Sequence, residues 1–298
     1  MESYDIRAYA KINLGLDVLR RLENGYHEVK MVMQTVGIYD ELALRRTVGG
    51  ITLAVDTGEI PADGNNLAHK AAKCLMEKYG ISEGIRIRLK KRIPVAAGMA
   101  GGSSDAAAVL LGMNRLFGLG LSGEELRKLA VGIGADVPYG IMGGTALAEG
   151  IGEKLTALNP APDCYVLVAK PGIRVSTRRV YEQLRLPGPW KPPDIDGMVA
   201  AIGGGDLEGM AARMGNVLES VTAEKYPVIR AWKRRLLELG ACNSLMSGSG
   251  PTVFGVFAEE AAAGKAYEVF LEETSCSPKD RKGRRGEQIF LTKFRKAC

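Results

Sequence analysis

The sequence predicts an α+β protein built in two halves. Its 298 residues are 46% hydrophobic and 25% charged, which suits a folded chain of about two domains. The first ninety residues alternate apolar and polar side chains in short runs, as strands do, whereas the later sequence adds runs with helical spacing. We expect an N-terminal domain over residues 1–158 and a C-terminal domain over residues 159–298.

Alternating or wholly apolar short runs predict the strands. In chain order these runs cover residues 4–16, 28–36, 41–46, 51–55, 84–93, 144–148, 164–169, 244–246, 252–257 and 288–294. Asn24 and Gly25 separate the first two runs, and this pair favours a tight turn because both residues tolerate positive φ. Pro171 and Gly172 indicate where the strand at 164–169 ends.

Runs with a period near 3.6 residues predict the helices. They cover residues 67–79, 106–117, 123–131, 207–220 and 228–239. Asn65 and Asn66 precede the first of these helices as candidate N-caps, and Gly80 stops it. The proline-rich residues 187–193 are expected to form a surface loop.

The cysteines, the N-terminal residues and the apolar segments indicate in which cellular compartment the protein is expected. The chain has five cysteines: Cys74, Cys164, Cys242, Cys276 and Cys298. They are odd in number, far apart and never arranged as CxxC, which argues against a disulfide framework or a zinc ribbon. Glu2 and Asp5 stand where a signal peptide would carry basic residues. Residues 131–148 are apolar on average but contain Asp136 and Pro138, so we interpret them as a loop and a buried strand. We therefore expect a cytoplasmic protein with no membrane partner.

The net charge of +6 is concentrated near the C-terminus. Residues 279–298 contain eight basic and two acidic side chains, so the rest of the chain is neutral. Such a tail is typical of a solvated terminus, and the alternative is an RNA-binding arm. Because RNA recognition usually needs a recognised module or interleaved aromatic side chains, we favour the solvated tail and expect no nucleic-acid partner.

A glycine-rich segment between a predicted strand and a predicted helix is the clearest candidate for chemistry. Its residues are Pro94, Val95, Ala96, Ala97, Gly98, Met99, Ala100, Gly101, Gly102, Ser103 and Ser104. Glycines let backbone N–H groups surround an anion, and the start of the following helix adds its dipole. The serine hydroxyls could donate to phosphate oxygens or approach a phosphate-bound Mg²⁺. The alternative is a tight turn that needs glycine for packing, and the paired serines favour phosphate.

Other nucleotide-binding signatures are weaker. No GxxxxGK[ST] sequence occurs, so this is not a Walker A loop. The one GxGxxG, at residues 118–123, follows a predicted helix instead of a strand, and we interpret it as a helix C-cap and loop.

Several motifs, in matching chain order, resemble those of the galactokinase, homoserine kinase, mevalonate kinase and phosphomevalonate kinase (GHMP) superfamily. Residues 94–105 resemble its phosphate-binding motif, and residues 248–252 resemble its third motif. Three further segments, residues 10–14, 24–27 and 134–138, narrow the resemblance to the 4-diphosphocytidyl-2-C-methyl-D-erythritol kinase family. Met99 and Ala100 replace the commoner Leu-Gly pair, and Asn24 stands where Asp is usual; neither change removes a backbone donor.

This resemblance implies a two-domain GHMP kinase fold. The N-terminal domain would resemble domain 2 of ribosomal protein S5, the C-terminal domain would be ferredoxin-like, and the active site would lie in the cleft between them. It also implies ATP-dependent phosphorylation, with Mg²⁺, of the 2-hydroxyl of a cytidine diphosphate-linked polyol. We expect a monomer or homodimer. A homoserine or mevalonate type of kinase is one alternative, and an RNA-binding module using the basic tail is another.

Two residues are implied to be catalytic. Asp136 is suited to act as the base that takes the acceptor hydroxyl's proton, and the alternative is an N-cap or loop-anchoring aspartate. The resemblance places Lys11 beside Asp136, where an ammonium would keep the carboxylate ionised and stabilise the transferring charge. The alternative for Lys11 is the solvated face of a strand.

The remaining site residues concern binding. The resemblance assigns Tyr26 and His27 to the cytidine end of the substrate, where an aromatic face can stack on a pyrimidine; the alternative is plain surface. It further implies substrate contacts by Asn13, Gly248 and Ser249, and nucleotide-base contacts by Asn65 and Asn66. His69 is the only other histidine, so a histidine-based metal site is not expected, and the metal ligands stay unassigned. Side chains without a motif are expected to serve packing only: Tyr181, Trp190 and Trp232.

Overall fold

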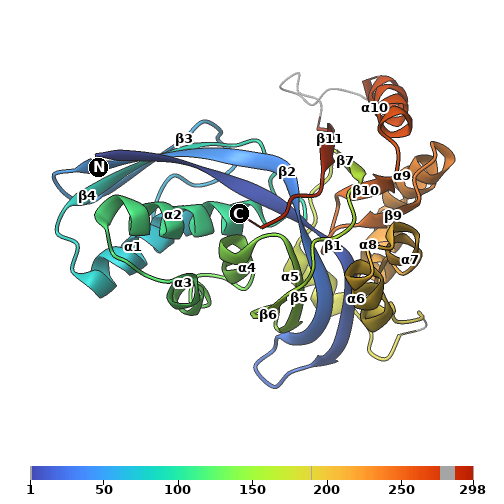
Figure 1. The fold of residues 1–298 in the computed structure, drawn as a ribbon, viewed down its shortest axis with the longest axis horizontal. Coiled ribbons are helices and arrows are strands. Elements are labelled where there is room, and N and C mark those ends of the chain that lie inside the picture. The colour runs from blue at the N-terminus through green and yellow to red at the C-terminus, as the bar shows by residue number, and fades with distance from the viewer. Residues whose placement is uncertain (1, 189, 276–285, 298) are drawn as a thin grey trace. The chain divides into compact units, whose positions relative to one another are not determined.

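The computed structural model describes residues 2–188, 190–275 and 286–297 (Figure 1). The chain forms two compact units that interleave along the sequence. The first consists of Met1–Ala10, Ile38–Val95 and Ala100–Gly143, and the second of Lys11–Gly37, Ala96–Met99 and Gly144–Cys298. These units differ from the expected single division at residue 158, because the first two strands each continue from one unit into the other.

Those two strands are longer than the sequence predicted. β1 covers Ser3–Arg21 and β2 covers His27–Thr47, whereas the pattern predicted two strands in place of β2. Gly37 and the fully buried Asp40 interrupt the apolar alternation, but the backbone stays extended through both. A hydrophobic pattern reports burial on one face, so a buried polar residue hides the continuity of a strand.

In the first unit a sheet is covered by helices. β4 (Gly84–Lys90) pairs antiparallel with the second half of β2 and parallel with β3 (Ile51–Val55). α1 (Leu67–Tyr79) and α2 (Gly101–Phe117) lie along one face of this sheet, followed by α3 (Gly123–Ala130) and α4 (Val137–Met142) (Figure 1). The predicted boundaries of α1 are confirmed, with Asn66 as N-cap and a left-handed Gly80 as C-cap.

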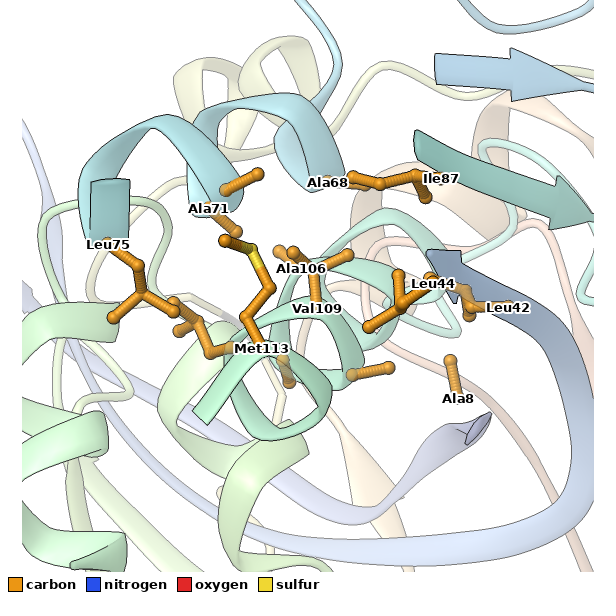
Figure 2. Close-up of a cluster of buried hydrophobic side chains, with 14 of the residues drawn as sticks. Ala8, Leu42, Leu44, Ala68, Ala71, Leu75, Ile87, Ala106, Val109 and Met113 are labelled. Carbon is orange, nitrogen blue, oxygen red and sulfur yellow. The ribbon is translucent and has the colours of Figure 1, made fainter. Parts of the chain in front are cut away.

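The core of the first unit is made by strands and both long helices. Figure 2 shows Leu42 and Leu44 from β2 facing the side chains of α1 and α2, with Met113 beneath Ala71. Alanines on both helices let the backbones approach closely, and each larger buried apolar side chain contributes roughly 1.5–3 kcal/mol. This packing holds α2 in place, and with it residues 101–104 of the glycine-rich segment, which form the first turn of this helix.

The second unit contains an antiparallel four-stranded sheet with the order β11-β7-β10-β9. These strands are β7 (Tyr165–Lys170), β9 (Asn243–Met246), β10 (Val253–Phe257) and β11 (Gln288–Lys293). The helices of this unit are α5 (Thr177–Gln183), α6 (Ile195–Gly203), α7 (Leu207–Ala212), α8 (Glu219–Lys225), α9 (Pro227–Glu238) and α10 (Glu260–Ser275). α9 and α10 pack on the sheet (Figure 1).

Further strands outside this four-stranded sheet also belong to the second unit. β5 (Thr145–Gly150) pairs with the first half of β2 and with β6 (Lys154–Ala157). β8 (Gly215–Asn216) pairs parallel with β1 at Gly15 and Leu16.

Several sequence predictions need correction. The helix expected at 207–220 is wrong: α7, β8 and the start of α8 occupy this stretch, because tertiary pairing with β1 overrides its helical spacing. Residues 131–148 contain the short helix α4 as well as a strand, and α5, α6, α10 and β6 were not predicted. The GxGxxG is confirmed as a cap and loop, since Gly118 ends α2 and Ser122 begins α3. Within the described ranges no helix is both long and apolar enough to cross a membrane.

Candidate active site

The glycine-rich segment has an unusual backbone. Ala96, Gly98 and Ala100 have φ values of 52°, 74° and 57°, so left-handed residues alternate with others up to the start of α2. Ala100 is the N-cap residue of α2 and has no side-chain group that could satisfy the first N–H donors. Asn66 does this for α1, as does Ser122 for α3. The start of α2 therefore presents backbone donors suited to an anion.

Gly98 also meets a packing requirement. Ser247 Oγ donates to the Gly98 carbonyl oxygen at 2.9 Å, and a β-carbon on Gly98 would lie 2.1 Å from the Ser247 carbonyl oxygen. The next residue, Gly248, has a φ of 55° and also approaches the Gly98 backbone. Gly98 therefore meets the packing requirement that was the alternative to anion binding.

Lys11 is a buried cation and does not lie on a solvated strand face, so that alternative is wrong. The residue is 5% exposed, and its Nζ donates to Asn13 Oδ1 at 2.7 Å. The backbone N–H of Lys11 donates to the carbonyl oxygen of Met99, in the glycine-rich segment, at 3.2 Å. Asn13 is fully buried and its amide nitrogen lies 3.2 Å from Met31 Sδ. The structure thus brings Lys11, Asn13, Met99, Gly98 and Gly248 together within the second unit.

Asp136 occupies the N-cap position of α4, in the first unit. Its side chain makes no capping hydrogen bond, so the N-cap alternative has the right position but lacks its usual contact. The segment around it packs on the first turns of α2: a β-carbon on Gly140 would lie 2.7 Å from Ala107 Cβ, and one on Gly134 would lie 4.0 Å from Ser103 Oγ. The half-buried carboxylate is therefore on a segment held against the helix that carries Ser103 and Ser104.

A buried charge cluster behind the start of α2 was not predicted. Lys91 Nζ bonds Asp40 Oδ2 at 2.5 Å and Asp105 Oδ2 at 2.7 Å, and Asp40 Oδ1 accepts from the N–H groups of Arg92 and Ile93. Burial raises the pKa of Asp105 to about 8, against the attraction of Lys91. Burial alone would lower the pKa of Lys91, but the two carboxylates raise it. An aspartate directly after the two serines was the only signal that could have identified the cluster.

An aromatic pair lies in the second unit near the β1–β2 turn. The rings of His27 and Tyr181 are 5.1 Å apart, centroid to centroid, and Tyr26 is 58% exposed. Burial and the nearby Arg21 lower the pKa of His27, which favours the neutral imidazole. The expectation that Tyr181 serves packing alone misses this contact, because residues so far apart in sequence carry no local signal of their proximity.

The other residues predicted to bind nucleotide or substrate differ in their exposure and in whether their side chains already form hydrogen bonds. Asn66 Oδ1 accepts from the Ala68 N–H at 2.9 Å and its amide donates to the Pro61 carbonyl oxygen at 2.7 Å, so its side chain is committed to the helix cap. Asn65 is exposed. Ser249 is buried, and its hydroxyl shares a 2.8 Å hydrogen bond with Thr177 Oγ1.

The described part of the chain contains no group of three or more His, Cys, Asp or Glu side chains able to hold a metal ion. The three cysteines among the described residues are free thiols: Cys74, Cys164 and Cys242.

Comparison with known proteins adds the family. The model of the GHMP kinases N terminal domain matches residues 66–144, and that of the GHMP kinases C terminal domain matches residues 198–274. A 4-diphosphocytidyl-2-C-methyl-D-erythritol kinase from Lachnospira eligens is 53% identical over 285 residues, covering 92% of this chain and 99% of the relative. One from Lachnoclostridium phytofermentans is 50% identical and covers 99% of this chain and 98% of the relative.

Solved structures agree on the fold. A crystal structure of 4-(cytidine 5'-diphospho)-2C-methyl-D-erythritol kinase matches with a TM-score of 0.80 and 32% identity, covering 98% of this chain and 99% of that one. A homoserine kinase from Cytophaga hutchinsonii matches with a TM-score of 0.78 at 21% identity, which shows a common fold alone. The α+β, two-domain GHMP kinase fold is thereby confirmed. On these matches, the chain belongs to the 4-diphosphocytidyl-2-C-methyl-D-erythritol kinase family of GHMP kinases.

Proposed function

We propose that the protein is an ATP-dependent kinase that phosphorylates the 2-hydroxyl of 4-diphosphocytidyl-2-C-methyl-D-erythritol and releases ADP. The observation that carries this proposal is its 53% identity to a kinase of that name, over 99% of the relative's length. Homoserine and mevalonate kinases are matched at 21% and 16% identity, which supports their fold and not their substrates.

ATP would be held by the glycine-rich segment, residues 94–104. Two features support this assignment: the start of α2 lacks a side-chain cap, and the left-handed residues before it turn the backbone in a way that suits several N–H donors to one anion. Ser103 and Ser104 add hydroxyl groups at the first turn of α2. For the adenine base, the committed Asn66 side chain makes the exposed Asn65 the better candidate contact.

Mg²⁺ would accompany ATP and neutralise charge on the phosphates. The residues fit a magnesium ion that is held mainly by nucleotide and water, because this ion usually takes only one or two protein ligands beside phosphate oxygens. Ser103 and Ser104 are the side chains that could supply such a ligand from the helix start.

Asp136 would take the proton of the acceptor hydroxyl as its oxygen attacks the terminal phosphorus, and Lys11 would stabilise the negative charge of the transferring phosphoryl group. The first role is supported by the position of this half-buried carboxylate, on a segment packed against the first turns of α2. The second is supported by a buried ammonium held by Asn13, since an ordered cation needs no reorganisation during the reaction.

The cytidine end of the acceptor would bind at Tyr26 and His27, with Tyr181 as an added aromatic wall. A neutral imidazole can donate from one nitrogen and accept at the other, as the polar edge of a pyrimidine requires. Asn13, Gly248 and Ser249 would contact the polyol portion. We further propose that the enzyme acts in the cytoplasm, as a monomer or homodimer.

The proposed function is tested by ADP release with a panel of acceptors at fixed ATP and Mg²⁺. Turnover with 4-diphosphocytidyl-2-C-methyl-D-erythritol, and at least 100-fold lower kcat/KM with homoserine and mevalonate, is the expected result. Equal turnover with either amino-acid or mevalonate acceptor would assign the chain to a different kinase. RNA binding without ADP release from any acceptor would favour the alternative based on the basic tail.

A further inference from the structure

Asn216 is a buried amide whose polar atoms are all engaged. It lies on β8 and is 8% exposed. Its Nδ2 donates to the carbonyl oxygens of Met246 and Gly248, at 2.7 and 2.8 Å, and its Oδ1 accepts from the Leu218 N–H at 3.0 Å. A primary amide has two N–H groups on one nitrogen, so this side chain can bridge two carbonyls that lie two residues apart.

The loop that Asn216 bridges combines internal hydrogen bonds with left-handed glycines. The Ser247 N–H donates to the Thr252 carbonyl oxygen, and the Gly250 N–H donates to the Ser247 carbonyl oxygen, both at 2.9 Å. Gly248 and Gly250 have φ values of 55° and 85°, and glycines lose the most conformational freedom when ordered. The two carbonyls that Asn216 binds flank Ser247, one on each side. Further contacts support the same loop: Glu219 Oε1 accepts from the Met246 N–H at 2.7 Å, and Thr222 Oγ1 donates to the Ser249 carbonyl oxygen at 3.1 Å.

Ser247 in turn touches the glycine-rich segment. Its hydroxyl donates to the Gly98 carbonyl oxygen, and its own carbonyl oxygen lies 2.1 Å from the position that a β-carbon of residue 98 would take. A small displacement of Ser247 would therefore either break this hydrogen bond or push the Gly98 backbone. All of these residues belong to the second unit.

We propose that Asn216 is a positioning residue for ATP, which fixes Ser247 through the Met246 and Gly248 carbonyls and thereby sets the backbone of the phosphate-binding segment at Gly98. This inference rests on the proposed function, in which residues 94–104 bind the phosphates of ATP. Asn216 touches neither substrate; it acts through Ser247.

The test compares Asn216→Asp with Asn243→Asp. Aspartate keeps the shape and the acceptor of asparagine but cannot donate when ionised, and it repels a carbonyl oxygen. Asn243 is a matched control on β9: its amide donates to the Ala211 carbonyl oxygen at 2.6 Å and accepts from the Ser244 N–H at 2.8 Å, with no contact to the loop at 246–250. Asn216→Asp loses donation to two backbone carbonyls and Asn243→Asp to one, and each substitution adds one carboxyl group.

Two measurements read the effect. Amide hydrogen exchange of the ligand-free protein should show at least tenfold faster exchange in peptides covering residues 94–104 for Asn216→Asp, with less than a twofold change for Asn243→Asp. In kinetic assays the KM for ATP should rise at least tenfold in Asn216→Asp and stay within threefold of the parent in Asn243→Asp. Because the exchange experiment needs no ATP, it reports on positioning even if the parent proves not to be a kinase.

The inference fails if Asn216→Asp leaves both exchange and the KM for ATP within threefold of the parent, or if Asn243→Asp changes them equally. Should Asn216→Asp not fold, Ser247→Ala decides the matter, since it removes the hydroxyl that bonds Gly98 and leaves Asn216 in place. An unchanged KM for ATP and unchanged exchange in that variant would overturn the proposal, and a rise of threefold or more in both would support it.

Discussion

The main chain of Gly98 lies so close to Ser247 that a β-carbon at residue 98 would be 2.1 Å from the Ser247 carbonyl oxygen. Non-bonded atoms do not approach to this distance, so the backbone would have to move. Gly98 also has a φ of 74°, which only glycine adopts at little cost. The residue therefore needs both the conformational freedom and the missing side chain of glycine.

Gly98→Ala should for this reason lower ATP affinity at least tenfold, as measured by isothermal titration. Gly118→Ala is the control, because Gly118 has a similar φ of 65° but nothing within 4 Å of the position a β-carbon would take. The control should lose only about 1–2 kcal/mol of stability from its left-handed backbone and bind ATP like the parent. Parental ATP affinity in a folded Gly98→Ala protein would show that this segment does not hold the nucleotide.

Much of the fold could be predicted because local patterns and tertiary packing agree. The helix at 67–79 has caps at both ends and an apolar stripe, and its boundaries were right. The helix predicted at 207–220 was wrong because Asn216 pairs with β1 and donates to two distant carbonyls. Neither interaction can be inferred from the neighbouring residues. A pattern within one segment cannot report a partner that lies far along the chain.

The candidate site was predictable where a motif is contiguous and not where it is assembled. The glycine-rich segment could be identified from residues 94–104 alone. The ring contact of His27 with Tyr181 and the bonding of Lys91 to Asp40 join residues that are remote in sequence. The backbone at Ala100 was predictable only in part. Alanine stands where glycine is commoner in the motif, and the structure gives it a left-handed φ of 57°.

Asp136→Asn should bind ATP like the parent and lose about 10² to 10⁴ in kcat, the usual range for a positioned general base. The amide keeps the size of the carboxylate but cannot accept the proton of the acceptor hydroxyl. Lys11→Met, which keeps the aliphatic stem without the charge, should show a similar loss. ADP release at saturating substrates measures both, and near-parental kcat in Asp136→Asn would return this residue to a structural role in the loop.

Stability should depend on pH through Asp105. Its pKa is raised by burial to about 8 from an ordinary value of 3.8, so the folded protein keeps a proton that the unfolded chain has already lost. The contribution from this proton is fully present below pH 3.8 and is lost as the pH rises to 8, at no more than about 1.4 kcal/mol per pH unit.

Asp105→Asn has no proton to lose, so its melting temperature relative to that of the parent should rise between pH 5 and pH 8.5. Thermal melting across this range measures the difference. Asp163→Asn, at an exposed carboxylate, is the control for the loss of one acidic side chain. A constant difference between parent and Asp105→Asn would mean that Asp105 is already ionised in the folded protein throughout the range.

Ending the chain after Pro278 should destabilise the protein, with a loss of at least 10 °C in melting temperature. The deletion removes β11, whose residues pair with β7 from Gln288 to Lys293, and it removes the hydrogen bond from the Arg295 N–H to the Thr35 carbonyl oxygen. Changing the basic residues at 279–285, which lie outside the described residues, to glutamine should instead leave melting and turnover within error of the parent. Loss of turnover in this second variant would give the basic tail a part in catalysis.

His27→Ala should raise the KM for the acceptor strongly and lower kcat modestly. The imidazole is proposed to bond the edge of the cytosine, remote from the hydroxyl that reacts, so its loss removes binding energy more than chemistry. An unpaired polar contact of this kind corresponds to about 1–3 kcal/mol in kcat/KM. Tyr181→Ala should act in the same direction, because its ring lies 5.1 Å from that of His27. Methylerythritol 4-phosphate, which lacks the cytidyl group, provides the control: it should be a poor acceptor for the parent and no poorer for His27→Ala. If the variant loses as much activity on this truncated acceptor as on the full one, His27 supports the fold or the chemical step, and the cytidine end binds elsewhere.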